Sequence, residues 1–179
     1  MVTSAVEPSA LLLNGTVGVG KTTVADAMGD LLQGAGVPGA VVDLDWLRRC
    51  WPSPDSDPFQ LELTLTNLSA VARNFRDAGA VRLVLAGVVE TQGDRAAHAA
   101  AVGLPLRLCR LRVALPLVRE RLTARHHGDP GGLAWHLRRS GELDRLLDIA
   151  DVDDFTVDAT HLSAAATAAA VLRAAGWAH

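Results

Sequence analysis

The sequence predicts an α/β fold with a five-stranded parallel sheet flanked by helices. Short, continuous apolar runs alternate with amphipathic segments along the chain. Strands of a parallel sheet read as such runs because both of their faces are buried. Strands that alternate with helices favour parallel pairing, since a parallel connection needs a crossover segment. A glycine-rich turn between the first apolar run and the first helical segment supports the same order of elements.

The expected strands cover residues 10–14, 40–44, 81–89, 106–113 and 155–158. Apolar residues at helical spacing predict helices over residues 21–33, 59–77, 94–101, 117–125, 134–147 and 163–175. Glycine and proline separate these segments, and a GDPGG stretch at residues 128–132 is expected to break the chain. Arginines are interleaved in the fourth strand, which is therefore expected to be less completely buried.

The length of 179 residues suits a single domain over residues 1–179, and at 49% hydrophobic residues one sizeable core can form. Aromatic residues make up only 4%, so Leu, Val and Ala are expected to fill the core. A net charge of −3 gives no footprint for nucleic acid or an anionic membrane, and no apolar run approaches the roughly 20 residues of a spanning helix. No secretory pattern opens the chain, and Cys50 and Cys109 lack metal or disulfide spacing, which predicts reduced thiols in a cytoplasmic protein.

A phosphate-binding pattern lies between the first strand and the first helix. Residues 15–22 read GTVGVGKT and satisfy G-x-x-x-x-G-K-[S/T]. Glycines let successive backbone N–H groups turn toward a phosphate, and the following helix adds unpaired N–H groups and a favourable dipole. The lysine of this pattern reaches the β- and γ-phosphates, and the threonine hydroxyl holds Mg²⁺. The residues expected to contact a nucleoside triphosphate, most of all ATP, are Gly15, Thr16, Val17, Gly18, Val19, Gly20, Lys21, Thr22 and Thr23.

Lys21 is the only lysine in the chain, and the rest of the 17 basic residues are arginines. This composition suggests a bias that replaces lysine by arginine wherever a positive charge suffices. The surviving lysine lies inside the phosphate-binding pattern, between the strand and the helix that this pattern requires. A glycine-rich turn without a ligand is the alternative, and this context disfavours it. Lys21 is also expected to be catalytic.

With this loop, most of the chain resembles small P-loop kinases of the kind that includes adenylylsulfate kinase, gluconate kinase, shikimate kinase and chloramphenicol phosphotransferase. The resemblance implies a three-layer P-loop NTPase fold with a small helical lid at about residues 114–140. It also implies ATP and Mg²⁺ as ligands. The implied reaction transfers the γ-phosphoryl group to a hydroxyl of a small metabolite, a nucleotide-like molecule or an antibiotic.

Residues 42–48, VDLDWLR, are similar to the D-x-D-x-x-R stretch of adenylylsulfate kinase. The resemblance implies that Asp45 is catalytic and binds the acceptor together with Arg48, and that Asp43 serves the metal with Thr22. A carboxylate at the carboxyl end of a parallel strand faces the crevice in which ligands bind. Aspartates two residues apart in a strand would project to the same face. The alternative is that Asp45 only caps the helix that follows it.

Residues 119–125, RERLTAR, resemble the lid of these kinases, which implies that Arg121 and Arg125 are catalytic. The two arginines are four residues apart and therefore share one face of a helix. From that face they would neutralise charge on the transferred phosphoryl group. A solvated basic face on an ordinary helix is the alternative. His126 and His127 are expected to be exposed polar residues.

The sequence leaves two alternatives at each of three places: the metal site, the segment after the last strand, and the arginines that follow the second strand. No aspartate ends the apolar strand at residues 84–90 in the manner of a second metal motif, so either Asp43 or Glu90 would complete the metal site. Residues 158–161 follow the last strand and would either contact the adenine or cap the last helix. Arginines between residues 46 and 76 suggest an acceptor with an anionic or planar group, or else pack on the surface.

A nucleotide-binding regulator or slow ATPase without a small-molecule acceptor is the alternative function. A guanine-specific switch is excluded, because its N-K-x-D base reader needs a second lysine. The acidic balance disfavours a nucleic-acid end kinase. The expected partner is therefore a small-molecule acceptor, and not a nucleic acid or a membrane. The sequence does not indicate an oligomeric state.

Overall fold

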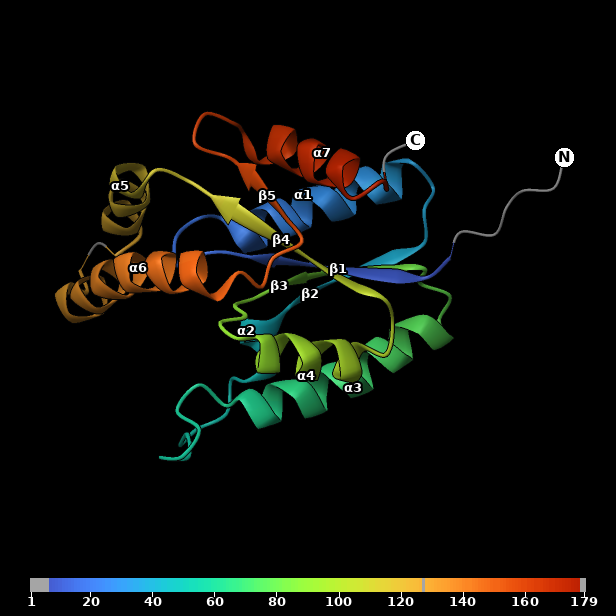
Figure 1. Cartoon of the computed structure of the whole chain (residues 1–179), viewed down its shortest axis with the longest axis horizontal. Coiled ribbons are helices and arrows are strands. Elements are labelled where there is room, and N and C mark those ends of the chain that lie inside the picture. Colours follow the sequence, from blue (N-terminus) through green and yellow to red (C-terminus); the bar gives the residue numbers. More distant parts are fainter. Residues whose placement is uncertain (1–6, 127, 178–179) are drawn as a thin grey trace, which may run out of the picture.

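The computed structural model describes residues 7–126 and 128–177 (Figure 1). Its strands are β1 Ser9–Asn14, β2 Gly39–Asp43, β3 Arg82–Ala86, β4 Leu106–Arg112 and β5 Phe155–Asp158. Its helices are α1 Lys21–Gly34, α2 Leu44–Leu47, α3 Leu61–Asp77, α4 Gln92–Val102, α5 Leu115–Arg125, α6 Pro130–Ala150 and α7 Ala164–Ala174. The strands form one parallel sheet in the order β2-β3-β1-β4-β5. The predicted α/β class and five-stranded parallel sheet are thus confirmed.

Helices cover both faces of this sheet. In Figure 1, α1 and α7 lie side by side above it, and α3 and α4 lie below. Because both faces are covered, alternate residues of β1 enter opposite halves of the core. Leu11 and Leu13 pack in the half that contains α1 and α7, and Leu12 packs in the half that contains α3 and α4. Leu, Val and Ala side chains form most of the core, as composition predicted.

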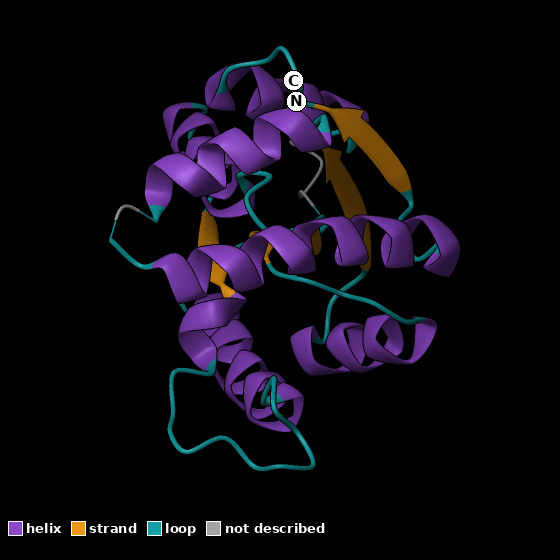
Figure 2. Ribbon diagram, turned by 90° about the vertical axis from the view of Figure 1, so that its left-hand side faces the viewer, coloured by secondary structure: helices purple, strands orange, loops and turns teal. Residues whose placement is uncertain are grey.

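Two further parts of the chain lie outside these layers. α5 and α6 lie beyond the C-terminal end of β4 (Figure 1). The loop between α2 and α3 extends away from the body of the molecule in both ribbon views (Figures 1 and 2). Ligands of open parallel sheets bind in the crevice at the carboxyl ends of the strands. The functional site is therefore to be sought between these two parts.

Three strands end earlier than predicted, and β4 does so by one residue, at Arg112. β2 ends at Asp43, and the short helix α2 begins at the next residue. β3 ends at Ala86 and does not reach residue 89. Here the chain turns toward the buried side chain of Asn14, whose amide donates to the carbonyl oxygen of Val89 (3.0 Å) and accepts from its N–H (3.1 Å). These side-chain bonds replace the strand pairing that the apolar run suggested.

α6 also differs from the prediction, because it begins at Pro130, inside the GDPGG stretch that was expected to break the chain. Asp129 caps this helix: its side chain accepts a hydrogen bond from the N–H of Gly132 at 3.0 Å. A proline is compatible with the first turn, where its missing N–H would have had no partner. The helix continues without a break to Ala150.

Neither cysteine forms a disulfide within the described residues. Cys50 is exposed, and Cys109 is buried in β4. Burial raises the pKa of the Cys109 thiol to about 12. Across residues 7–126 and 128–177, no helix combines the length and the apolar character needed to cross a membrane.

Candidate nucleotide and acceptor site

The loop between β1 and α1 occupies a narrow space that requires glycine at two positions. Gly15 has a φ of 138°, and a β-carbon there would lie 2.6 Å from the carbonyl oxygen of Leu111 in β4. Gly18 has a φ of 83°, and a β-carbon there would lie 2.9 Å from Cγ of Leu122 in α5. Glycine is the residue that tolerates both the backbone angles and the close approach. The loop is thus held between the sheet and α5.

Lys21 folds back over this loop from the first position of α1. Its Nζ donates hydrogen bonds to the carbonyl oxygens of Gly15 (2.8 Å) and Thr16 (3.1 Å). Burial lowers the pKa of Lys21 to about 8, although the nearby carboxylates of Asp45 and Asp43 oppose the shift. The ammonium is therefore still protonated at neutral pH, and it places a positive charge at the loop.

Thr22 and Asp43 lie in direct contact, because Oγ1 of Thr22 donates a hydrogen bond to Oδ2 of Asp43 at 2.7 Å. Oδ1 of Asp43 accepts a second hydrogen bond, from the N–H of Asp45 at 2.9 Å, and so caps α2. The capping role considered for Asp45 is therefore wrong, since Asp43 has it. The two aspartates also do not project from one face of a strand, because β2 ends before Asp45.

A cavity of about 800 Å³ opens beside the loop, between α1, α2, α5, the start of α6 and the segment that follows β5. The predicted site residues that line it are residues 17–23, Asp45, Arg48, Arg121 and Arg125. Gly15, Thr16 and Asp43 are not among its lining residues.

A hydrogen bond within the protein explains why Thr16 does not line the cavity. It is buried, and its hydroxyl donates to the carbonyl oxygen of Ser140 in α6 at 2.6 Å. The side chain expected to face a nucleotide instead ties the phosphate-binding loop to α6.

Two arginines of α5 line the same cavity as the loop. Nη1 of Arg121 makes one long contact, 3.4 Å, with the carbonyl oxygen of Val19. Within residues 7–126 and 128–177, neither Arg121 nor Arg125 forms an ion pair. Arg119 lies on the same helix but does not line the cavity. The guanidinium groups of Arg121 and Arg125 are thus available to an anionic ligand.

Asp45 and Arg48 line another part of the cavity as an ion pair. The side chain of Asp45 is 68% exposed. Nη1 of Arg48 also donates to the carbonyl oxygen of Phe59 at 3.0 Å. Phe59 and Trp135 line the cavity as well. Sequence reasoning missed both aromatic residues, because their only signal is an apolar side chain in a proline-rich loop or at the start of a charged helix.

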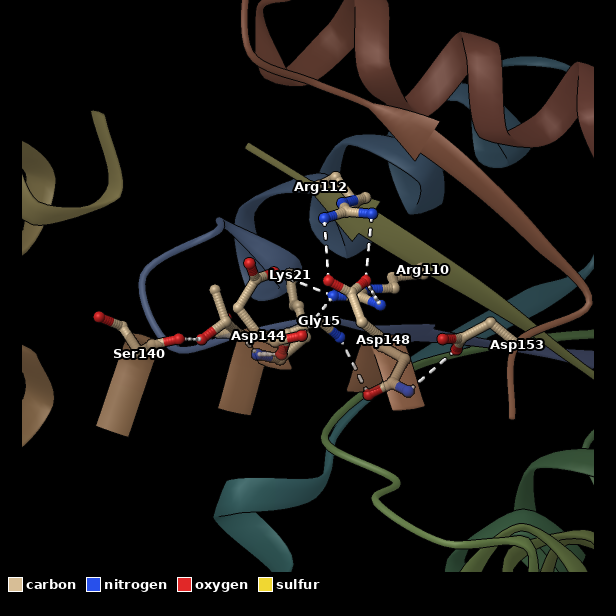
Figure 3. A network of polar contacts seen from close by, with 10 residues as sticks. Gly15, Lys21, Arg110, Arg112, Ser140, Asp144, Asp148 and Asp153 are labelled. Carbon is tan, nitrogen blue, oxygen red and sulfur yellow. Dashed lines mark hydrogen bonds and ion pairs between the residues drawn. The ribbon is translucent and has the colours of Figure 1, made fainter. Parts of the chain in front are cut away.

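Charged residues attach α6 to the sheet (Figure 3). Arg110 of β4 is only 5% exposed, and its guanidinium pairs with Asp144 (2.9 Å) and Asp148 (2.7 Å) of α6. Arg112 pairs with Asp148 as well, at 3.1 Å. The sequence contains a signal for this contact, namely arginines in an apolar strand and two aspartates one helical turn apart.

Glu90 takes part in the same attachment, since it pairs with Arg139 of α6. The sequence left open whether Asp43 or Glu90 would complete a metal site. The contact between Asp43 and Thr22 favours Asp43, because Glu90 already has a cationic partner.

His126 is half-buried, so the expected exposure is wrong. Its ring lies 4.4 Å from the ring of His136, a residue of α6 that lines the cavity. The second histidine of the predicted pair, His127, lies outside the described residues.

The arginines around α3 do not gather at the cavity. Of those between residues 46 and 76, all of which are described, only Arg48 lines it. Arg49 stacks on the ring of Trp46 at 4.4 Å, and Arg76 donates to a carbonyl oxygen beyond α4. Surface packing, the alternative considered for these arginines, therefore describes Arg49 and Arg76.

The segment after β5 contributes apolar groups to the cavity. Ala159 and Leu162 line it, whereas Asp158 uses its carboxylate to accept from the N–H of Thr160 at 2.9 Å. Ser163, and not a residue of 158–161, caps α7. The alternative for residues 158–161 was a strand end with a helix cap: β5 does end at Asp158, but the cap is wrong.

A family model described as AAA domain matches residues 11–134, which is more than half of the chain. The chain belongs to the AAA domain family. No curated protein sequence matches this member of the family.

Solved structures resemble this AAA domain protein over nearly its whole length. The tunicamycin resistance protein of Deinococcus radiodurans is 19% identical with a TM-score of 0.67, and the match covers 96% of this chain and 98% of that one. The APS kinase of Mycobacterium tuberculosis, in complex with AMPPNP and APS, is 20% identical with a TM-score of 0.60, covering 95% and 98%. The shikimate kinase of Acinetobacter baumannii, in complex with shikimate, is 20% identical with a TM-score of 0.59, covering 94% and 93%. The P-loop kinase fold implied by the sequence resemblance is thus confirmed.

Proposed function

We propose that this AAA domain protein is an ATP-dependent phosphotransferase that transfers the γ-phosphoryl group of ATP to a hydroxyl of a small molecule. One observation carries the proposal: a single cavity joins a phosphate-binding loop, two arginines that form no ion pair with any described residue, and an exposed carboxylate. The similar fold of an APS kinase bound to AMPPNP and of a shikimate kinase bound to shikimate supports it.

The phosphates of ATP would lie along the loop and the start of α1. Backbone N–H groups of residues 17–20 and the N-terminal end of α1 favour an anion there. Lys21 would exchange its hydrogen bonds to loop carbonyls for bonds to the β- and γ-phosphates. Arg121 and Arg125 would neutralise the charge that accumulates on the transferred group.

Thr22 and Asp43 would hold Mg²⁺. The donor set fits this ion, because a hydroxyl and a carboxylate 2.7 Å apart are hard oxygen ligands beside the phosphate-binding loop. The described residues contain no group of three or more His, Cys, Asp or Glu that would form a metal site of protein ligands alone. Few protein ligands are what Mg²⁺ uses when phosphates and water complete its octahedron. When bound, it would neutralise charge on the phosphate oxygens.

Asp45 would orient the acceptor and take its proton. Its exposed carboxylate lines the cavity, and the ion pair with Arg48 fixes its direction. In the reaction, a bond forms between the acceptor oxygen and the γ-phosphorus while the bond from that phosphorus to the bridging oxygen of ADP breaks. The hydroxyl proton passes to Asp45.

The proposal is tested in two steps. Calorimetry should detect binding of ATP with Mg²⁺, and Lys21→Ala should lose most of that affinity while circular dichroism reports a folded protein. Thermal-shift screening of metabolites and antibiotics in the presence of AMPPNP should then find a compound that stabilises only together with the nucleotide. That compound should accept ³²P from [γ-³²P]ATP. ATP hydrolysis that no compound stimulates would favour the slow ATPase instead, and unchanged affinity in folded Lys21→Ala would end the proposal.

A further inference from the structure

We infer, on the basis of the proposed phosphotransferase function, that the acceptor is an electrically neutral, hydroxylated molecule with an aromatic or similarly flat apolar ring. This ring would pack against Phe59 and Trp135. Two independent observations carry the inference: exposed aromatic surface in one part of the cavity, and compensation of every cation in that part.

The aromatic surface comes from two elements that are far apart in sequence. Phe59 precedes α3 and is 49% exposed, and Trp135 belongs to the first turns of α6 and is 43% exposed. Both line the cavity. The guanidinium of Arg139 lies 5.4 Å above the ring of Phe59. Trp135 is four residues before Arg139 and so lies on the same face of α6.

The two rings therefore belong to one part of the cavity. Asp45 lies near it, because Arg48 joins the Asp45 carboxylate to the carbonyl oxygen of Phe59. Large apolar side chains that stay exposed inside a cavity are the usual contacts of a ligand with an apolar body. A few polar groups beside them then fix its orientation. Here the carboxylate of Asp45 is such a group, and a hydroxyl is the partner that it accepts from.

The two cations nearest Phe59 are already neutralised, namely Arg48, which lines the cavity, and Arg139, which lies over the Phe59 ring outside the lining. Arg48 pairs with Asp45 and also donates to a backbone carbonyl. Arg139 pairs with Glu90 and lies 3.3 Å from the carboxylate of Glu142. A carboxylated, sulfated or phosphorylated acceptor would have to displace one of these carboxylates or lie beside it. Either arrangement disfavours an anion.

In the other part of the cavity, the cations form no ion pairs with carboxylates of the described residues. Among the described residues, Lys21 donates hydrogen bonds to two backbone carbonyls and forms no ion pair, although the carboxylates of Asp45 and Asp43 are near it. Arg121 and Arg125 have no carboxylate partner among these residues. A triphosphate accounts for these three cations. The cavity thus divides into a cationic part that suits ATP and a charge-balanced aromatic part that suits a neutral acceptor.

The test uses two fluorescent probes that differ by one sulfonate. N-phenyl-1-naphthylamine is neutral, and 8-anilinonaphthalene-1-sulfonate has the same rings with one negative charge. Each is titrated into the full-length protein saturated with AMPPNP and Mg²⁺, so that the nucleotide occupies the cationic part. We expect the neutral probe to bind at least about tenfold more tightly, because the carboxylate of Asp45, which lines this part of the cavity, repels the sulfonate.

Variants assign the binding to the aromatic pair. Phe59→Ala and Trp135→Ala should each weaken the neutral probe by about tenfold and leave AMPPNP affinity unchanged. Trp51→Ala is the matched control, because Trp51 is 85% exposed and does not line the cavity. Asp45→Asn should strengthen binding of the sulfonated probe several-fold, since it removes the carboxylate that neutralises Arg48.

Three results would overturn the inference: tighter binding of the sulfonated probe to the unmodified protein, binding of neither probe, or binding that Phe59→Ala and Trp135→Ala do not change. All three can occur while AMPPNP still binds in calorimetry, in which case the inference fails and the proposed function does not. Loss of AMPPNP binding itself would instead contradict the proposed function.

Discussion

Lys21 has a charge that depends on pH within an accessible range, because burial lowers its pKa to about 8. Phosphate binds the protonated form, so the affinity for ATP should stay constant below about pH 8 and fall as the pH rises above it, by about tenfold per unit. Calorimetry from about pH 7 to pH 9.5 measures this dependence. Lys21→Ala should show weak affinity with no change above pH 8. An affinity of the unmodified protein that is flat across this range would contradict the prediction.

Steady-state kinetics can separate a catalytic role of Asp45 from a role in structure or in ATP binding. Asp45→Asn keeps the size of the side chain and leaves the cap of α2 intact, since Asp43 makes that cap. We expect phosphoryl transfer to fall by about 100-fold or more, the scale of a positioned acid–base group, while ATP affinity stays unchanged. Steady-state kinetics with the acceptor found by screening provide the measurement. Near-normal turnover would remove Asp45 from the mechanism.

At the scale of elements, α5 carries arginines that line the cavity and one arginine that does not, so their roles can be compared. Arg121→Ala and Arg125→Ala should lower kcat by about tenfold or more, and should change ATP affinity less, because they act most strongly on the transition state. Arg119→Ala is the control, since this exposed arginine of the same helix does not line the cavity. Equal effects of all three substitutions on turnover would assign α5 a structural role only.

The attachment of α6 to the sheet should depend on Arg110 far more than on Arg112. Arg110→Ala removes a guanidinium that is 6% exposed and leaves the carboxylates of Asp144 and Asp148, which are 19% and 44% exposed. Because solvent reaches those carboxylates, we expect a loss of about 1–3 kcal/mol in the free energy of unfolding. Arg112→Ala, at a 46% exposed side chain, should cost less than about 1 kcal/mol.

Urea unfolding of the two variants, monitored by circular dichroism, measures this difference. A loss of free energy that is equal for Arg110→Ala and Arg112→Ala would show that burial of Arg110 does not govern the attachment.

At the scale of the whole molecule, ligand binding should appear as thermal stability. ATP with Mg²⁺ at about 100 times its Kd should stabilise the folded state by about 2.7 kcal/mol, which corresponds to a rise in Tm of about 5–10 °C for a chain of this length. Chelation of Mg²⁺ by EDTA should remove most of this rise, and so should Asp43→Asn, because Asp43 and Thr22 are the expected ligands. A rise that is insensitive to both changes would exclude this metal site.

Local patterns predicted most of the fold. Apolar runs predicted all five strands, and their alternation with helices predicted the parallel sheet. The glycines of residues 15–20 gave the phosphate-binding loop, because few backbone conformations other than this one require glycine at such spacing. The boundaries of β3 and α6 were wrong, since the side chain of Asn14 and the cap from Asp129 decide them.

The sequence by itself determined the class of fold, the loop and the identity of its single lysine. Each of these can be seen in the order and spacing of residues along the chain. Only the tertiary structure decided which charges are free. It paired Arg48 with Asp45, Arg139 with Glu90 and Arg110 with two aspartates of α6, and it left Arg121 and Arg125 without an ion pair among the described residues. Most of these pairs join elements far apart in sequence, and no local pattern specifies which distant carboxylate a given arginine will meet.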